Sequence, residues 1–518
     1  MFGFILLAYV AFAAGLCFYF PYDVARLYRA IPSNATFVSA HDDLAARWPE
    51  LARHPLTAAV AARAFDMPEE EIAGLPRNAM ISGWLDRLAR KKTVCAYVPA
   101  MGRSGQPAWV VVSWVGARAQ VQKAWLMFHP GRGMRRVDVG DGRWAWQVKA
   151  APGRPTWTFT WIEGIWVGCY SSDAQAISHM FRRMDHRPPL HVDLAQWLKR
   201  PPPAKDHGWV TFPLRGGDWE WPWLRFEVVR MAPAELALRV DGYVGSLAGR
   251  PPADADLEAM PEGVMRLLGA APAMCWRGTV PDLKNMRARP EESWMGILDH
   301  TNVLADGRAF IAVLDRGHSG HVYGVRSPSL VAGLQLRNPG QAQQMITESL
   351  DALNARYGLG LMPLVQQVPA AQGAGPRLMV GMDSVQPSTP RRPPDEWPAL
   401  TVVDDWLVLA AHREVLAALM AATNAAPAAR MAWVLSSQAG DRRLWVDIAS
   451  LAEVLQGAVA LCDLQRYATG SASGWRTPLE ELRRALESMK PFQHITVSYV
   501  AKDGQVSGDV RLGPDLPR

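Results

Sequence analysis

The feature that most constrains the fold is a repeated order of strands, turns and helices within the chain. The clearest pair of matching segments is 157–170 and 400–410. Each segment alternates apolar and polar residues, turns at Glu163-Gly164 or Asp404-Asp405, alternates again and leads into a helix. Such alternation about a two-residue turn predicts a β-hairpin. We place Trp166 and Trp406 at equivalent positions just after the two turns.

Three further matches occur in the same order along the chain, and each pairs similar patterns of strand, turn and helix. The matched segments are 35–40 with 273–278, 94–115 with 310–336, and 224–242 with 492–512. One match could arise by chance, because many hairpins resemble one another. Four matches in order indicate a tandem duplication.

This organisation predicts an α+β fold of two tandem homologous halves with large, mainly antiparallel sheets and packing helices, because hairpins recur with helices between them. One transmembrane helix precedes the halves. The second half carries additional material, namely a Gln/Gly/Pro-rich loop at 366–376, a Pro-rich loop at 387–394 and helices near 446–465 and 477–489. The expected parts are an anchor with its juxtamembrane collar at 1–30, a first repeat at 31–250, a linker at 251–261 and a second repeat at 262–518.

The N-terminal segment 2–20 is apolar throughout and has the length needed to cross a bilayer as a helix. It lacks the basic leader and the small-residue cleavage site of a secretory signal peptide, so we expect an uncleaved, single-pass signal anchor. No later stretch of the sequence is expected to span the membrane. Arg26 and Arg29 beyond the segment weakly favour a cytoplasmic location for the soluble part under the positive-inside rule.

Composition narrows the function. The chain has 22 Trp and a net charge of +6, but its Lys and Arg form no stripe interleaved with aromatic residues. We therefore expect no nucleic-acid partner, and a mildly basic surface suits an anionic membrane. No Cys-x-x-Cys pair occurs among the five Cys, which excludes a zinc ribbon, and we expect no cofactor. Cys95, Cys169 and Cys275 lie in apolar strands, where Cys acts as a small buried hydrophobe.

The loop that contains Asp315, His318 and His321 is the best candidate for a metal site, because these three side chains could act as ligands. The matching turn of the first half lacks both His, so a polar hairpin loop is the preferred interpretation and no metal is assigned. His41-Asp42-Asp43 also looks like a chemical site. It lies where a strand leads into a helix, however, and a helix cap explains the Asp residues.

Trp219, Trp221 and Trp223 form a candidate aromatic binding surface, since alternate residues of an extended segment share one face. Pro222 restricts this segment to an edge strand or a loop. Aromatic lids over one end of a core remain an alternative interpretation.

The arrangement resembles an uncharacterised family of bacterial N-terminally anchored envelope proteins with duplicated α+β domains of unknown function. The resemblance rests on two patterns, the opening Ile-Pro-Ser-Asn-Ala at 31–35 and the closing Lys-Pro-Phe-Gln-His-Ile-Thr at 490–496. It implies an extracytoplasmic, periplasmic location for the soluble part. It supplies no catalytic residue.

The leading functional hypothesis is a non-enzymatic binding or scaffolding protein of the bacterial envelope, held in the bilayer by residues 2–20 and contacting an envelope protein partner. The absence of a catalytic motif favours this class over an enzyme. One alternative is a carrier of lipids or other hydrophobic molecules, which requires a long apolar cavity. Another is a metal-assisted hydrolase that uses the loop of His318 and His321.

Overall fold

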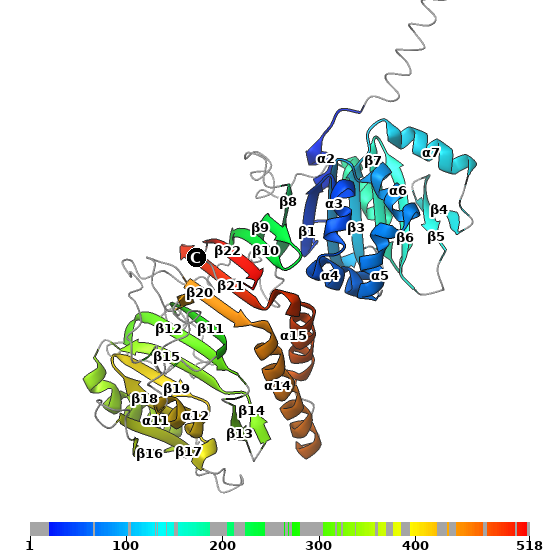
Figure 1. Cartoon of the computed structure of the whole chain (residues 1–518). Helices are drawn as coiled ribbons and strands as arrows, with labels where there is room; N and C mark the ends of the chain where they lie inside the picture. The colour runs from blue at the N-terminus through cyan, green and yellow to red at the C-terminus, as the bar shows by residue number, and fades with distance from the viewer. Residues whose placement is uncertain are drawn as a thin grey trace, which may run out of the picture. The chain divides into compact units, whose positions relative to one another are not determined.

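The structure, a computed structural model, divides into two compact units, Met1–Pro233 and Ala234–Arg518 (Figure 1). It describes residues 20–65, 68–101, 105–129, 131, 133–140, 142–149, 154–186, 205–211, 223–243, 264, 268, 272–279, 304–315, 317, 319–322, 325–336, 338–357, 361–368, 377–384, 394–421, 433–434, 442–469, 474–502 and 505–514. The predicted α+β class with a large antiparallel sheet and packing helices is confirmed. Residues 2–19 of the expected anchor and the expected linker 251–261 lie outside the described residues.

The first unit combines a sheet with helices inserted between its strands. Its elements are α2 (Val24–Arg29), β1 (Phe37–Asp42), α3 (Leu44–Leu51), α4 (Pro55–Phe65), α5 (Glu69–Gly74), η1 (Leu75–Arg77), α6 (Ala79–Leu88), β2 (Lys92–Met101), β3 (Gln106–Trp114), α7 (Arg118–Phe128), β4 (Met134–Gly140), β5 (Arg143–Val148), β6 (Thr156–Ile162), β7 (Ile165–Ser171), α8 (Ile177–His186), β8 (Asp206–Thr211) and β9 (Trp223–Ala232).

The strands of the first unit lie in the order β9-β8-β1-β2-β3-β7-β6-β5-β4, with antiparallel neighbours. A row of directly opposed residues crosses the middle strands on one face. This row, Val38, Ala96, Val110 and Cys169, is at most 1% exposed. It packs in one core with apolar side chains of α2 and α8. The period-2 alternation of the strands thus directs every second side chain into this core.

Helices also cover part of the opposite face of this sheet. A second apolar cluster joins Leu126 of α7 to Trp146, Phe159 and Trp161 of β5 and β6, with Trp84 of α6 packed against it. This sheet therefore lies between two helical layers, and several of its Trp residues fill the second one.

The second unit repeats the alternation of hairpins and helices. Its elements are β10 (Glu235–Tyr243), β11 (Pro272–Thr279), β12 (Leu304–Leu314), β13 (Gly320–Val322), β14 (Val325–Ser327), β15 (Leu330–Leu336), η6 (Pro339–Gln341), α11 (Ala342–Tyr357), β16 (Leu361–Val368), β17 (Arg377–Ser384), η7 (Pro394–Glu396), β18 (Ala399–Val403), β19 (Trp406–Ala410), α12 (Arg413–Ala421), β20 (Arg442–Asp447), α14 (Ile448–Thr469), α15 (Arg476–Ser488), η8 (Lys490–Phe492), β21 (His494–Lys502) and β22 (Gln505–Gly513).

The strands of the second unit lie in the order β10-β22-β21-β20-β11-β12-β15-β19-β18-β17-β16, again with antiparallel neighbours. A buried row, Cys275, Ala312, Val331 and Ala410, crosses its middle strands. It packs in one core with Leu416 and Leu419 of α12.

The expectation that no later stretch reaches spanning length is wrong for α14. Among the described helices, α14 has the length and apolar composition that a membrane span needs, over Ile448–Tyr467. Its first turns nevertheless bury Ile448, Leu451 and Leu455 within the protein. Core helices of soluble proteins meet the same requirement, so α14 is weak evidence for a second span.

The two hairpin turns lie where the sequence predicts them, but the two Trp residues are not equivalent. Ile165 directly faces Ile162 across the first turn, and Trp406 directly faces Val403 across the second. Trp166 is therefore one residue further along its strand than Trp406. Trp406 lies in the core with α12, whereas Trp166 packs against the cluster of α6 and α7 on the opposite face.

Candidate functional site

Five aromatic residues form a continuous line across the sheet of the first unit, on the face opposite the α2/α8 core. Cross-strand pairs join Phe37 to Tyr97, Tyr97 to Trp109, Trp109 to Tyr170, and Tyr170 to Trp157. Directly opposed residues share one face of a sheet. We call these five residues, one from each of β1, β2, β3, β7 and β6, the aromatic row.

The rings of the aromatic row contact one another and remain half-buried. The ring centroids of Tyr97 and Trp109 are 5.2 Å apart, and those of Trp157 and Tyr170 are 5.5 Å apart. Phe226 of β9 extends the row, because its ring stacks on that of Phe37 at 6.1 Å. All five side chains of the row have intermediate exposure. Half-buried rings of this kind can offer both apolar area and polar edges to a ligand.

A buried polar cluster lies further along the same sheet face. His41 Nδ1 lies 2.9 Å from Asp206 Oδ1, and His41 Nε2 lies 3.1 Å from Ser39 Oγ. Arg47 of α3 forms an ion pair with the other oxygen of Asp206. Beside them, the hydroxyl oxygens of Thr93 and Ser113 are 3.0 Å apart.

His41 is held neutral by its surroundings. Burial, together with the positive charges of Arg47 and Lys92, lowers the pKa of His41 to about 4. A carboxylate only accepts hydrogen bonds, so the Nδ1–H of neutral His41 donates to Asp206. The Nε2 atom then accepts a hydrogen bond from the Ser39 hydroxyl.

This Ser39–His41–Asp206 connectivity is also that of a nucleophilic triad, but its setting favours a structural role. The Ser39 side chain is only 7% exposed, so a substrate has little access to its hydroxyl. Both neighbouring strands, β2 and β8, pair with β1 at Ser39, which leaves few backbone N–H groups to stabilise an oxyanion. In addition, Arg47 already neutralises Asp206, which would otherwise stabilise a protonated His41.

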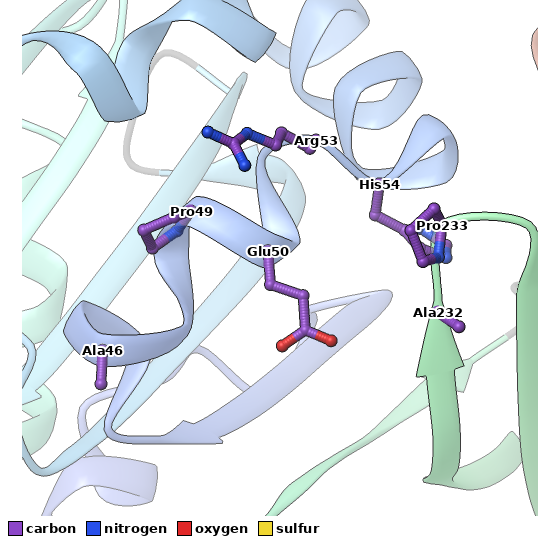
Figure 2. Close-up of a pocket in the computed structure, with 7 residues that line it drawn as sticks. All are labelled: Ala46, Pro49, Glu50, Arg53, His54, Ala232 and Pro233. Carbon is purple, nitrogen blue, oxygen red and sulfur yellow. The ribbon is translucent and has the colours of Figure 1, made fainter.

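A recess of about 360 Å³ lies beside α3 in the first unit (Figure 2). Its lining residues are Ala46, Pro49, Glu50, Arg53, His54, Ala232 and Pro233. The side chain of Glu50 points toward the end of β9, whereas that of Arg53 points away from it (Figure 2). Because charged and small residues dominate its wall, the recess does not resemble the long apolar cavity that a hydrophobe carrier needs.

The structure describes two of the three predicted metal-site residues. Asp315 follows β12, His321 lies in β13, and His318 lies outside the described residues. The Nδ1 atom of His321 lies 2.9 Å from Glu414 Oε1 of α12. Within the described ranges, no group of three or more side chains has the arrangement of a metal site.

The predicted Trp surface is described at one residue only. Trp223 is the first residue of β9 and faces Thr211 of β8, whereas Trp219 and Trp221 lie outside the described residues. The expected helix cap is confirmed for Asp43, whose side chain accepts a hydrogen bond from Ala46 N at 3.4 Å.

The cysteines in strands behave as buried hydrophobes, as predicted. Cys169 and Cys275 are buried and Cys95 is half-buried, and all three are free thiols. Burial raises the pKa of each of these thiols to about 12, so they are unreactive near neutral pH.

Sequence reasoning missed both the aromatic row and the polar cluster. The alternation of Trp157, Phe159 and Trp161 was a usable signal for the row, but the register that aligns it with Phe37 and Tyr97 depends on four separate strand pairings. Comparison with known proteins brings no further residue to the site. No family model, no curated protein and no solved structure matches the chain.

Proposed function

We propose that this chain is a membrane-anchored, non-enzymatic binding protein of the bacterial envelope, built from two copies of one α+β unit. The anchor is the apolar segment 2–20. The extracytoplasmic location of the soluble part follows from the family resemblance and is part of the proposal.

The duplication is supported by the strand order of each unit. The order β8-β1-β2-β3-β7-β6-β5-β4 of the first unit has its counterpart in β20-β11-β12-β15-β19-β18-β17-β16 of the second. In each unit a helix, α7 or α11, follows the third of these strands in chain order, β3 or β15. A second helix, α8 or α12, follows the hairpin whose last strand pairs with that third strand.

The registers support the duplication as well. The two buried rows cross equivalent strands in the same order. One row runs from Val38 to Cys169 in the first unit, and the other runs from Cys275 to Ala410 in the second. Both hairpin turns also place a non-glycine residue in the left-handed region, Glu163 at φ 43° and Asp404 at φ 53°. Unrelated sheets would share a register at this many positions only by coincidence.

The aromatic row is the observation that carries the binding function. Five half-buried rings cross five adjacent strands and provide an extended, rigid and amphipathic surface. Aromatic rings give large contact area at low cost in conformational entropy, and they are enriched where proteins bind each other. We propose that a protein partner presenting apolar or aromatic side chains binds along this row.

Site-specific photo-cross-linking in the native membrane tests this proposal. A photoreactive phenylalanine analogue at Tyr97 should give one cross-linked product of defined size. The same analogue at Leu330, which lies in β15 of the second unit and is 43% exposed, should not. Trp157→Ser, a change three strands away in the same row, should abolish the product at Tyr97. A product that forms equally at Leu330, or that persists in the Trp157→Ser variant, contradicts the proposal.

Neither alternative function has an observation of its own among the described residues. The hydrolase would need a third ligand beside His321, whose partner is Glu414. The carrier would need a long apolar cavity, and the recess beside α3 is a small one of about 360 Å³ whose wall includes the charged Glu50 and Arg53.

A further inference from the structure

The outer face of α7 is apolar, which is unusual for a helix at a protein surface. Val121, Trp125 and Phe128 are 61%, 50% and 79% exposed. Their spacing of four and three residues places them on one side of the helix. Three large apolar side chains on a single exposed stripe mark a site of interaction rather than scattered surface residues.

The inner face of the same helix is apolar too. Ala119 and Leu126 are each 1% exposed and pack in the cluster that includes Trp146 and Phe159. A surface helix of a soluble protein normally has one apolar and one polar face. The core therefore accounts for only one of the two apolar faces of α7.

The sequence around α7 is basic and contains no acidic residue. From residue 87 to residue 137 there is no Asp or Glu, whereas Lys and Arg occur ten times. Arg118 at the start of α7 and Arg136 on β4 are both exposed. Two acids from outside this stretch, Asp86 and Glu163, each form an ion pair with an arginine. An apolar stripe with basic neighbours fits an anionic lipid surface.

The described chain begins beside the start of α7. Phe20 lies against Gly164 in the β6–β7 turn, and the ring of Tyr22 lies 5.4 Å from that of Trp114 at the end of β3. The carbonyl of Gly164 accepts hydrogen bonds from the backbone N–H groups of Val115 and Gly116, which lead into α7. Figure 1 shows α7 at the end of the first unit where the described chain begins.

This placement limits how far α7 can be from the bilayer. If residues 2–20 cross the membrane, then Phe20 marks the interface. The start of α7 is joined to the β6–β7 turn that Phe20 contacts. An eleven-residue helix is about 16 Å long, so α7 remains within about 16 Å of the anchored end, and its whole outer face reaches the headgroup region when the helix lies parallel to the bilayer.

We propose that the outer face of α7, with Val121, Trp125 and Phe128, inserts into the headgroup region of an anionic bilayer beside the anchor. This inference rests on the proposed membrane anchor. The bound helix holds the first unit against the membrane surface in a fixed orientation, so that one end of its sheet faces the lipid.

The test uses the full chain in vesicles of phosphatidylcholine with phosphatidylglycerol, with an environment-sensitive fluorophore attached at one position at a time. Labels at residues 125 and 128 are compared with a control label at residue 351, which is exposed on α11 of the second unit. Lipids that carry a quencher near the headgroup should quench the α7 labels at least about threefold more strongly than the control. Replacing phosphatidylglycerol by phosphatidylcholine should reduce the quenching at residues 125 and 128.

A second variant and an independent assay separate the ways in which the inference can fail. Val121→Glu with Trp125→Glu should abolish quenching at residue 128 without unfolding the chain, because both side chains are at least half exposed. Alkaline carbonate extraction tests the anchor on its own, since a spanning helix stays with the membrane. If the chain resists extraction but residues 125 and 128 are not quenched, the inference on α7 is wrong and the anchor stands. Labels that are shielded from water yet not quenched by lipid would place a protein on α7 and would also overturn it.

Discussion

The helices α7 and α11 occupy the same place in the strand order of their units but present opposite kinds of outer surface. Both follow the third strand of the series and bury an Ala in the first turns, Ala119 and Ala342. The outer residues of α7 are apolar. Those of α11 include polar, exposed side chains, namely Gln344, Thr347, Glu348 and Asp351. Packing against the sheet thus explains the inner faces, and the outer face of α7 is the one for which we propose a contact with lipid.

The outer faces of the two sheets differ in the same direction. Tyr97 and Trp109 of the aromatic row have Val313 and Leu330 as their counterparts in the register of the second unit. The polar row of His41, Thr93 and Ser113 likewise has Gly278, Ala309 and Leu334 as its counterparts. The specialised surfaces therefore lie in the first unit, which is the one that follows the proposed anchor.

The largest expected effect tests whether the two cores are built alike. Val110→Asp and Val331→Asp replace fully buried residues at matching places in the two core rows. Each change buries a charge without a partner and should cost about 4 kcal/mol or more in the free energy of unfolding of its unit. Limited proteolysis should show the altered unit degraded first.

The same substitution at an exposed valine is the control. Val121→Asp on α7 should leave both units resistant to protease, because that side chain is 61% exposed. A second unit that tolerates Val331→Asp would mean that the two rows are not equivalent, and the comparison of the units would fail with it.

The sequence predicts the hairpins and their turns well, because alternation and turn residues are local signals. It predicts the face of each strand less well. Aligning Ala35 with Ala273 in sequence makes Trp276 the equivalent of Val38. The buried rows of the two units instead make Cys275 the equivalent of Val38. A shift of one residue moves every side chain to the other face of the sheet, and local alternation does not fix this shift when two segments of different sequence are aligned.

The loop expected at 366–376 illustrates a related limit. Its first residues, 366–368, belong to β16, which pairs with β17 in a hairpin that the loop prediction does not include. The polar cluster shows the second limit, namely distance along the chain. His41 and Asp206 are 165 residues apart, and they meet only because β8 pairs with β1.

The effect of intermediate size is a pH dependence of the stability of the first unit, caused by His41. The pKa of His41 is lowered from 6.5 to about 4 in the folded chain, so between these values the unfolded chain binds more protons. The free energy of unfolding of the first unit is therefore unaffected by the titration of His41 above about pH 6.5, and it decreases as the pH falls toward 4. The loss should be on the order of 3 kcal/mol.

Urea unfolding of the wild type and of His41→Gln at several pH values measures this effect. Gln cannot titrate, so the stability advantage of the wild type over His41→Gln should shrink as the pH falls from 6.5 to 4. The second unit has Gly278 at the matching place, so its unfolding transition should not differ between the wild type and His41→Gln over the same range. An advantage that stays constant or grows on acidification would contradict a neutral, buried His41.

The smallest expected effect distinguishes the two hairpin turns. Glu163 at φ 43° and Asp404 at φ 53° adopt a left-handed conformation that costs about 1–2 kcal/mol for most side chains. Gly avoids this cost but loses about 0.5–1 kcal/mol through the greater entropy of its unfolded state. Asp tolerates the left-handed region better than Glu. Glu163→Gly should therefore stabilise the chain by about 0.5 kcal/mol, and Asp404→Gly should have almost no effect.

Because Glu163 also pairs with Arg26, the comparison is made in an Arg26→Ala background, with the urea midpoint as the readout. A larger gain at Asp404 than at Glu163 would show that backbone strain does not distinguish the two turns.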